Sequence, residues 1–110
     1  MAWYRQVHTK IWADSWFIEL SIEQKLLFFY LITNRYTSVC GLYELPLRIM
    51  SFETGIDIEM LKLCFDDIFG KAGKAYYDYG SSVVWVVNML KYQGSTSPKL
   101  LAGKIGRAHV

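Results

Sequence analysis

The sequence contains few of the residues that most often carry catalysis, metal binding or cross-linking. Its two cysteines, Cys40 and Cys64, have no CxxC spacing, so we expect reduced and at least partly buried structural thiols, as in a cytosolic protein. Histidine is equally scarce: His8 lies in a polar segment that we expect to be a flexible surface, and His109 lies in the tail discussed below. Because there is no Ser-His-Asp arrangement, glycine-rich phosphate loop or metal-spaced Cys/His set, we expect no enzyme, no metal and no cofactor.

Long apolar runs and a strong excess of one charge are also missing. The longest apolar run, residues 26–32, is too short to span a membrane, and no signal-peptide pattern precedes it. Together with the opening residues 1–5, this predicts a cytoplasmic protein without a membrane partner. The net charge of +2 and the pI of about 8.5 permit nucleic-acid binding but do not indicate it. With 53% hydrophobic and 16% aromatic residues, the 110-residue chain has enough material for one folded domain.

A helix is expected from Ser21 to about Asn34. Ser21 and Gln24 fit a capping box, and the apolar residues that follow leave almost no polar face, so this helix should anchor the core. The run of residues 41–45 is too short and too tightly bounded for a helix, and we expect a strand there. Pro46, which follows it, suits the first turn of the next helix.

Two further helices are expected at about residues 46–53 and 58–69. Gly55 suits the left-handed residue that ends the first of them, and Asp57 suits the N-cap of the second. The core face of the second helix follows helical spacing and consists of Ile58, Leu61, Phe65 and Ile68.

Two strands are expected at residues 74–79 and 83–90, joined by a tight turn that contains Gly80. Side chains alternate between two faces in both strands, and the second strand is apolar on each face. The resulting order is helix, strand, helix, helix, strand, strand. We therefore predict an α+β, mainly α fold in residues 1–92, a winged helix-turn-helix with the order helix-strand-helix-helix-β-hairpin.

Four pieces of the sequence carry a family resemblance. They are Trp12-Ala13-Asp14-Ser15 ahead of the Leu20-Ser21 helix start, then Leu31-Ile32-Thr33-Asn34, then Gly41-Leu42-Tyr43-Glu44-Leu45-Pro46, and last Trp85-Val86-Val87-Asn88 leading into Leu90-Lys91-Tyr92-Gln93 and Ser97-Pro98-Lys99. In this order and spacing they resemble the N-terminal winged-helix domain of phage and prophage replication-initiation proteins, the DnaD-like or phage replisome organiser family. The resemblance covers about residues 4–99, which is most of the chain.

The resemblance implies a part in starting DNA replication inside a bacterial host cell. Members of the family bind the origin, open its strands or help to load the replicative helicase. They are longer than this chain and usually carry a C-terminal region that binds DNA or the helicase loader, so the replicative helicase or its loader is an implied partner of a missing region. The N-terminal module of the family is as apt to form a homo-oligomer as to contact duplex or single-stranded DNA. The family has no catalytic residues to carry over.

The end of the chain is expected to differ in origin from the rest. Residues 93–104 begin with a polar breaker stretch and are predicted to be a linker or the start of a truncated second domain. Residues 105–110 match one translation of a common short-read sequencing adapter, and the AAG codon of Lys104 can supply its first two bases. We expect this tail to be non-biological and the natural protein to continue beyond about Lys104, with a genuine short tail as the alternative.

A winged helix that reads DNA places its third helix in the major groove, where Arg, Lys, Asn or Gln side chains contact the bases. Here the exposed positions are Glu59, Lys62, Asp66 and Asp67, and the three carboxylates would repel phosphates. The candidates for DNA contact are Lys62, the basic residues elsewhere and one hairpin tyrosine, namely Arg5, Lys10, Arg35, Arg48, Lys71, Lys74, Lys91, Lys99 and Tyr79. Groove reading, non-specific phosphate contact and an ordinary solvated surface all remain open.

The aromatic residues allow two interpretations as well. The hairpin tyrosines Tyr76, Tyr77 and Tyr79 either stack on unpaired bases or pack within the hairpin. The N-terminal aromatic residues either form a dimer contact or pack on their own domain; they are Trp3, Tyr4, Trp12 and Trp16.

The predicted function is thus a phage or prophage replication-initiation module that binds DNA weakly, self-associates, or does both. A winged-helix transcriptional regulator is the first alternative, although such a protein should have a basic third helix. A protein-interaction module without DNA contact is the second alternative, and it should bind no DNA even at low salt.

Overall fold

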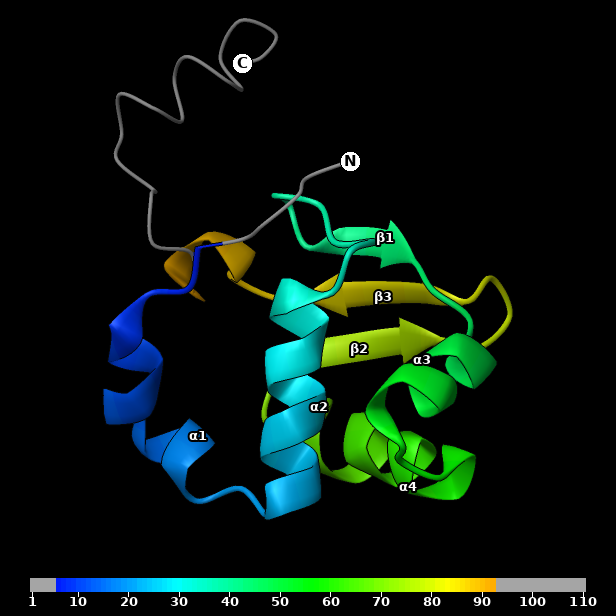
Figure 1. Ribbon diagram of the computed structural model, residues 1–110, viewed down its shortest axis with the longest axis horizontal. Helices are drawn as coiled ribbons and strands as arrows, with labels where there is room; N and C mark the ends of the chain where they lie inside the picture. Colours follow the sequence, from blue (N-terminus) through cyan, green and yellow to red (C-terminus); the bar gives the residue numbers. More distant parts are fainter. Residues whose placement is uncertain (1–5, 93–110) are drawn as a thin grey trace, which may run out of the picture.

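Helices and short strands follow one another along the chain in nearly the predicted order. The computed structural model describes residues 6–92, so the predictions about Trp3, Tyr4, Arg5, Lys99 and segments 93–104 and 105–110 lie outside the described residues. The elements are the 3₁₀ helix Thr9–Ala13, α1 (Ser15–Ile18), α2 (Ile22–Thr33), β1 (Leu42–Glu44), α3 (Leu47–Thr54), α4 (Ile58–Leu63), the π-helical segment Cys64–Phe69, β2 (Ala75–Asp78), β3 (Val83–Val86) and the 3₁₀ helix Met89–Tyr92. The fold is α+β and mainly helical, as predicted (Figure 1).

The central helix α2 begins at the predicted capping box. The Ser21 hydroxyl accepts a hydrogen bond from the Gln24 N–H at 3.2 Å, and the Gln24 side chain accepts one from the Ser21 N–H at 2.9 Å. Four side chains of α2 are buried, which are Leu27, Phe28, Leu31 and Ile32. Each contributes about 1.5–3 kcal/mol by leaving water. The helix therefore anchors the core, as expected.

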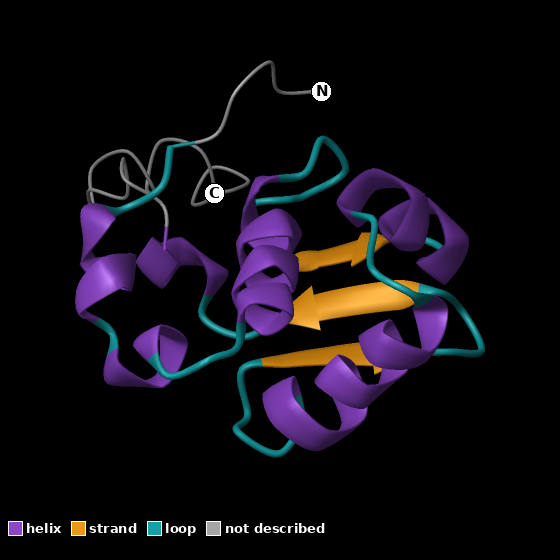
Figure 2. Cartoon of the chain, turned by 60° about the horizontal axis from the view of Figure 1, so that its bottom comes forward, coloured by secondary structure: helices purple, strands orange, loops and turns teal. Residues whose placement is uncertain are grey.

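The three strands form one antiparallel sheet in the order β1–β3–β2, and Figure 2 shows them side by side. Because side chains alternate across a strand, Val84 and Val86 are buried while Trp85 between them is exposed. The register places Leu42 of β1 opposite Trp85 and Trp85 opposite Tyr76 of β2. These three exposed residues, Leu42, Trp85 and Tyr76, form a straight line across the outer face of the sheet, which we call the outer row.

Strand β3 ends at Val86 rather than at the predicted Leu90. The Val86 N–H donates to the Gly41 carbonyl at 2.7 Å, and the Val87 N–H donates to the Lys74 carbonyl at 3.0 Å. Since β1 and β2 both begin next to these residues, a longer β3 would have no strand opposite it. The chain instead turns at Asn88, whose φ is 57°, and buries Met89 and Tyr92 from a 3₁₀ helix.

The third predicted helix is an α-helix over Ile58–Leu63 and a π-helix over Cys64–Phe69, and this change of helix type alters which residues lie on its core face. Leu61 and Phe65 are buried as predicted, but Ile58 is 36% exposed and Phe69 is fully buried beyond the half-buried Ile68. The Gly70 N–H donates to the Phe65 carbonyl five residues earlier, at 2.8 Å, so the last turn is a π-turn. Residues four apart therefore come to share the buried face.

The predicted helix caps around α3 and α4 are largely confirmed. Gly55 has the left-handed φ of 78° and ends α3, and the Asp57 carboxylate accepts a hydrogen bond from the Glu59 N–H at the start of α4. Pro46 is the N-cap of α3 and lies just outside its first turn, because its backbone is extended.

One expectation about an individual residue is wrong. Cys40 is exposed, because it lies in the turn before β1, whereas Cys64 is buried as expected. The His8 N–H donates to the Tyr92 carbonyl at 2.7 Å, and the His8 ring accepts a hydrogen bond from the Lys10 N–H. No helix within residues 6–92 is both long and apolar enough to cross a membrane.

Candidate nucleic-acid interface

The exposed face of α4 and the segment after it carries balanced or negative charge. Glu59 pairs with Lys62 at 4.0 Å, and Asp67 pairs with Lys71 at 3.8 Å. The Tyr79 hydroxyl donates to Asp66 at 2.9 Å, and burial together with this carboxylate raises the pKa of Tyr79. Two of the candidate lysines are thus already neutralised by carboxylates on this face. Such a face is unsuited to entering the major groove of DNA.

The remaining basic candidates lie in several places. Lys91 pairs with Asp14 at 3.8 Å, and the Lys74 ammonium lies 5.2 Å from the centre of the Trp16 ring. Lys10 is exposed at the N-terminal 3₁₀ helix. Only 15% of the Asp14 side chain is exposed, so Lys91 has a partly buried partner and is less available to a phosphate group than a lysine in a fully exposed pair.

Two arginines share one surface hollow. Arg35 follows the end of α2 and Arg48 lies in the first turn of α3, and both line a hollow of about 370 Å³. Its other lining residues are Tyr36, Ile49, Phe52 and Glu53. We call this region the α2–α3 hollow, and it brings two of the basic candidates together.

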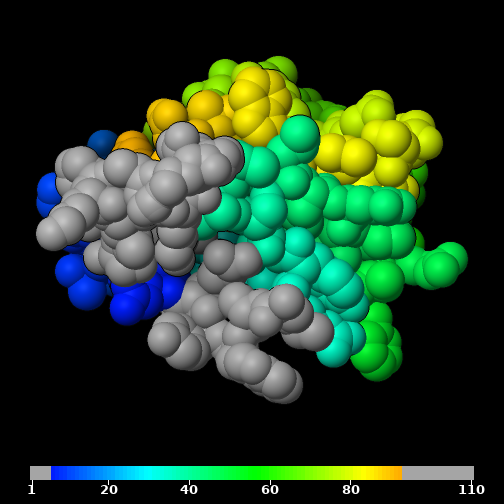
Figure 3. Space-filling model, turned by 90° about the horizontal axis from the view of Figure 1, so that it is seen from above, coloured from blue at the N-terminus to red at the C-terminus, as the bar shows by residue number. Residues whose placement is uncertain are grey.

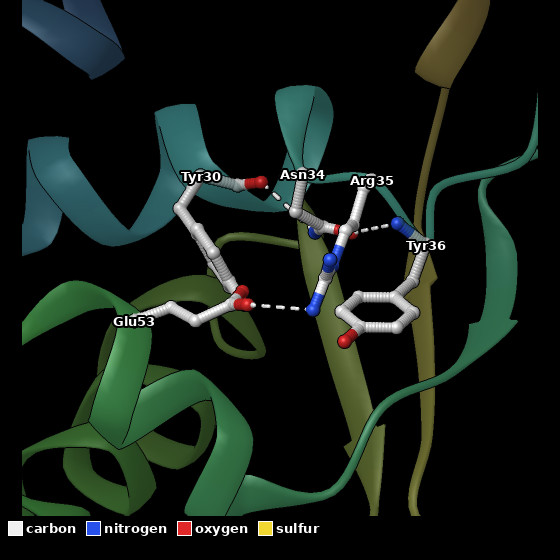
Figure 4. Close-up of polar contacts among 5 residues, drawn as sticks. All are labelled: Tyr30, Asn34, Arg35, Tyr36 and Glu53. Atoms are coloured by element: carbon white, nitrogen blue, oxygen red, sulfur yellow. Dashed lines mark hydrogen bonds and ion pairs between the residues drawn. The ribbon is translucent and has the colours of Figure 1, made fainter. Parts of the chain in front are cut away.

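Glu53 of α3 contacts Tyr30 and Arg35, at the end of α2, within this hollow (Figure 4). The Tyr30 hydroxyl donates to one Glu53 oxygen at 2.5 Å, and Arg35 lies 3.7 Å from the other. Burial and the Glu53 carboxylate both raise the pKa of Tyr30, so this phenol remains a hydrogen-bond donor. The Arg35 guanidinium also covers the ring of Tyr36, 5.2 Å from its centre.

Asn34 holds the backbone that presents Arg35 and Tyr36. Its side-chain carbonyl accepts a hydrogen bond from the Tyr36 N–H at 2.8 Å, and its amide donates to the Tyr30 carbonyl at 2.9 Å (Figure 4). The same amide donates to the Tyr43 hydroxyl at 3.0 Å, and Tyr43 donates in turn to the Leu31 carbonyl at 2.7 Å. Because α2 ends in these buried contacts, the turn after it has a defined conformation.

The three hairpin tyrosines have different surroundings. Tyr77 packs within the fold: its ring stacks on Phe65 at 5.1 Å and its hydroxyl donates to the Leu45 carbonyl at 2.8 Å. Tyr79 is held by Asp66, whereas Tyr76 is exposed and lies against Trp85 with ring centres 5.4 Å apart. Hairpin packing therefore accounts for Tyr77, and Tyr76 belongs to the outer row.

The two described N-terminal tryptophans also differ. Trp16 packs on its own domain, with its ring edge-on to Phe28 at 5.1 Å and to Phe69 at 5.8 Å. Trp12 contacts Phe17 at 5.3 Å but keeps 59% of its surface exposed. Of this pair, Trp12 is the one whose surface is open to a partner.

Sequence reasoning missed Phe52 and the outer row. Phe52 is 88% exposed on α3. Trp85 is exposed between two buried neighbours, as strand alternation requires, but the sequence did not show that Leu42 and Tyr76 lie beside it across the sheet. The signal for Phe52 was its position four residues after Arg48, which puts both on one face of α3.

No protein-family model, curated protein or solved structure matches the chain. Within residues 6–92, no three His, Cys, Asp or Glu side chains are grouped so as to hold a metal ion.

Proposed function

We propose that this domain is a winged-helix module of a phage or prophage replication-initiation protein that binds DNA weakly and without reading its sequence. The order helix, strand, helix, helix, strand, strand and the sheet order β1–β3–β2 support the proposal, because in a winged helix of this order α4 would be the recognition helix and the β2–β3 hairpin would be the wing. The resemblance of the four sequence pieces supports the role in replication. Its setting would be the cytoplasm of a bacterial host, with the helicase or its loader as a partner of a region outside this domain.

The observation that carries the mode of DNA binding is the distribution of charge. The exposed face of α4 and the segment after it carries three carboxylates and two lysines that are both paired with carboxylates, whereas Arg35 and Arg48 line the α2–α3 hollow. A protein with this distribution contacts phosphates and positions itself on the nucleic acid, but does not select bases in the groove. This is also why a transcriptional regulator is the weaker alternative, since its α4 would have to read an operator.

The test is the salt dependence of DNA binding, measured by fluorescence anisotropy with a labelled duplex. We expect weak binding to every duplex sequence, with log K falling by about 0.9 per phosphate contact for each tenfold rise in salt, or roughly 2 for two arginines. Replacing both Arg35 and Arg48 by Ala should remove most of this slope, and the matched control Lys62→Ala should change it little. Binding that ignores salt, or no binding at about 50 mM salt, would refute the DNA role.

Self-association is a second candidate function, and the outer row favours it. Leu42, Trp85 and Tyr76 are 55%, 48% and 40% exposed, respectively, and are adjacent across the sheet. In the space-filling view the green surface of β1 lies beside the yellow surface of β3 (Figure 3). Adjacent exposed aromatic and aliphatic side chains are typical of protein interfaces.

Sedimentation equilibrium over a range of concentrations tests self-association. The average mass should rise with concentration, and Trp85→Ala should suppress the rise. Ile22→Ala, which truncates an exposed residue of α2, is the control and should leave the rise unchanged. A mass that is monomeric at every concentration argues against this second function.

A further inference from the structure

Phe52 is the most exposed large apolar side chain among the described residues, at 88%. It lies one helical turn after Arg48 on α3, and both residues line the α2–α3 hollow. An open aromatic ring beside a cation offers a flat apolar face and a positive charge within one small area. These are the two features by which proteins bind a nucleobase and its phosphate.

The two arginines of the hollow are available to an anion. Arg48 is exposed and has no carboxylate partner among residues 6–92. The contact between Arg35 and Glu53 is long, at 3.7 Å, and 63% of the Arg35 side chain is exposed, so the pair exchanges readily with phosphate. Glu53 keeps its hydrogen bond from Tyr30 when Arg35 moves, so its carboxylate is not left unpartnered.

We propose that the α2–α3 hollow binds single-stranded nucleic acid, with backbone phosphates on Arg48 and Arg35 and an unpaired base stacked on Phe52. The inference rests on the proposed nucleic-acid function and adds the form of the ligand and the residues that hold it. A duplex keeps its bases paired and stacked inward, so it presents no base face to Phe52. The Tyr36 ring is already covered by Arg35, which leaves Phe52 as the open aromatic surface of the hollow.

The first experiment separates stacking from charge. The probes are a fluorescein-labelled oligothymidylate of about 12 nucleotides, an abasic strand of the same length and charge, and a duplex of the same length. The wild-type domain should bind the thymidylate about 10-fold more tightly than the abasic strand. Phe52→Ala should abolish this preference. Ile22→Ala is the matched control, because it also truncates a highly exposed apolar residue of a helix, and it should retain the preference.

The second experiment tests the phosphate contacts. Arg48→Ala should lower the salt slope on the single strand by about 0.7, the value for one phosphate contact, while preserving the preference for bases over abasic sites. Lys62→Ala should leave both quantities unchanged, because Lys62 lies on α4, outside the hollow, and pairs with Glu59 there. Both substituted side chains are exposed, so a circular dichroism melt should match that of the wild type and rule out unfolding.

Three results would overturn the inference while leaving DNA binding intact. These are equal affinity for thymidylate and abasic strands, a preference that survives Phe52→Ala, and equal or tighter binding of the duplex. Displacement of the thymidylate by a poly-glutamate peptide at equal charge concentration would likewise show a generic anion site and overturn it. Failure of the wild type to bind any of the three DNA probes at low salt would instead refute the proposed DNA function itself.

Discussion

Replacing Asn34 by Ala should strongly destabilise the domain. Asn34 is only 7% exposed, and its side chain makes three hydrogen bonds, to the Tyr36 N–H, the Tyr30 carbonyl and the Tyr43 hydroxyl. The Tyr30 carbonyl keeps the Asn34 backbone N–H as a donor, and Tyr43 keeps the Leu31 carbonyl as an acceptor. The substitution therefore orphans one group outright, the Tyr36 N–H, and removes two further hydrogen bonds.

The expected loss follows from these contacts. About 1 kcal/mol for each of the two removed hydrogen bonds, together with about 1–3 kcal/mol for the orphaned, partly buried Tyr36 N–H, gives a loss of about 3–5 kcal/mol. A domain of this size has a free energy of unfolding of about 4–13 kcal/mol, so the loss is a large fraction of the total. In thermal terms a loss of about 3 kcal/mol lowers the Tm by roughly 12–24 °C.

Urea unfolding followed by circular dichroism is the assay, and the m-value should not change. Tyr43→Phe is the graded comparison, because it removes the bonds to Asn34 and Leu31 but leaves Tyr36 satisfied, and it should cost about 1–2 kcal/mol. Arg35→Ala is the surface control and should stay within about 0.5 kcal/mol. If Asn34→Ala changed stability by less than about 0.5 kcal/mol at constant m-value, the hydrogen-bond argument for the end of α2 would be wrong.

Two further predictions concern glycine and cysteine. Gly41→Ala should destabilise the domain by more than about 2 kcal/mol, because the φ of Gly41 is 82° and a Cβ there would lie 2.4 Å from the Val86 carbonyl oxygen. Gly55 is the control, because its φ is 78° but a Cβ there would have no atom within 4 Å. Gly55→Ala should therefore cost only about 1 kcal/mol in the same urea titration. Equal losses would contradict the role given to the close approach of Gly41. In native protein a thiol reagent should label Cys40 quickly, because it is exposed and a hydrogen bond with Ser38 lowers its pKa, whereas burial raises the pKa of Cys64 to about 11. Cys40→Ser should therefore eliminate the fast phase, and rapid labelling that remains in this variant would show that Cys64 is accessible.

Features set by a few neighbouring residues were predictable from the sequence. The capping box at Ser21, the left-handed Gly55 and the N-cap Asp57 each depend on hydrogen bonds within one turn, and all three are confirmed. The alternation of buried and exposed residues around Trp85 follows from strand geometry alone.

Features set by distant residues were not predictable in this way. The end of β3 depends on where β1 and β2 begin, so the apolar sequence after Val86 suggested a strand that has no partner. The shared hollow of Arg35 and Arg48 requires α3 to pack beside the end of α2, a contact that no local pattern specifies. Ion pairs such as Lys91 with Asp14 join residues that are far apart in the sequence, and a count of basic residues does not show that their charges cancel.

The hydrogen bond from the His8 N–H to the Tyr92 carbonyl joins the first and the last segments of the described residues. Figure 1 shows these two segments, blue and orange, together on the side away from α3 and α4. A tension applied through residues 6 and 92 is therefore borne first by the contact between the two terminal turns, while the sheet and the hollow carry no load. Any polypeptide attached at these two points therefore joins the domain on the side away from α3 and α4.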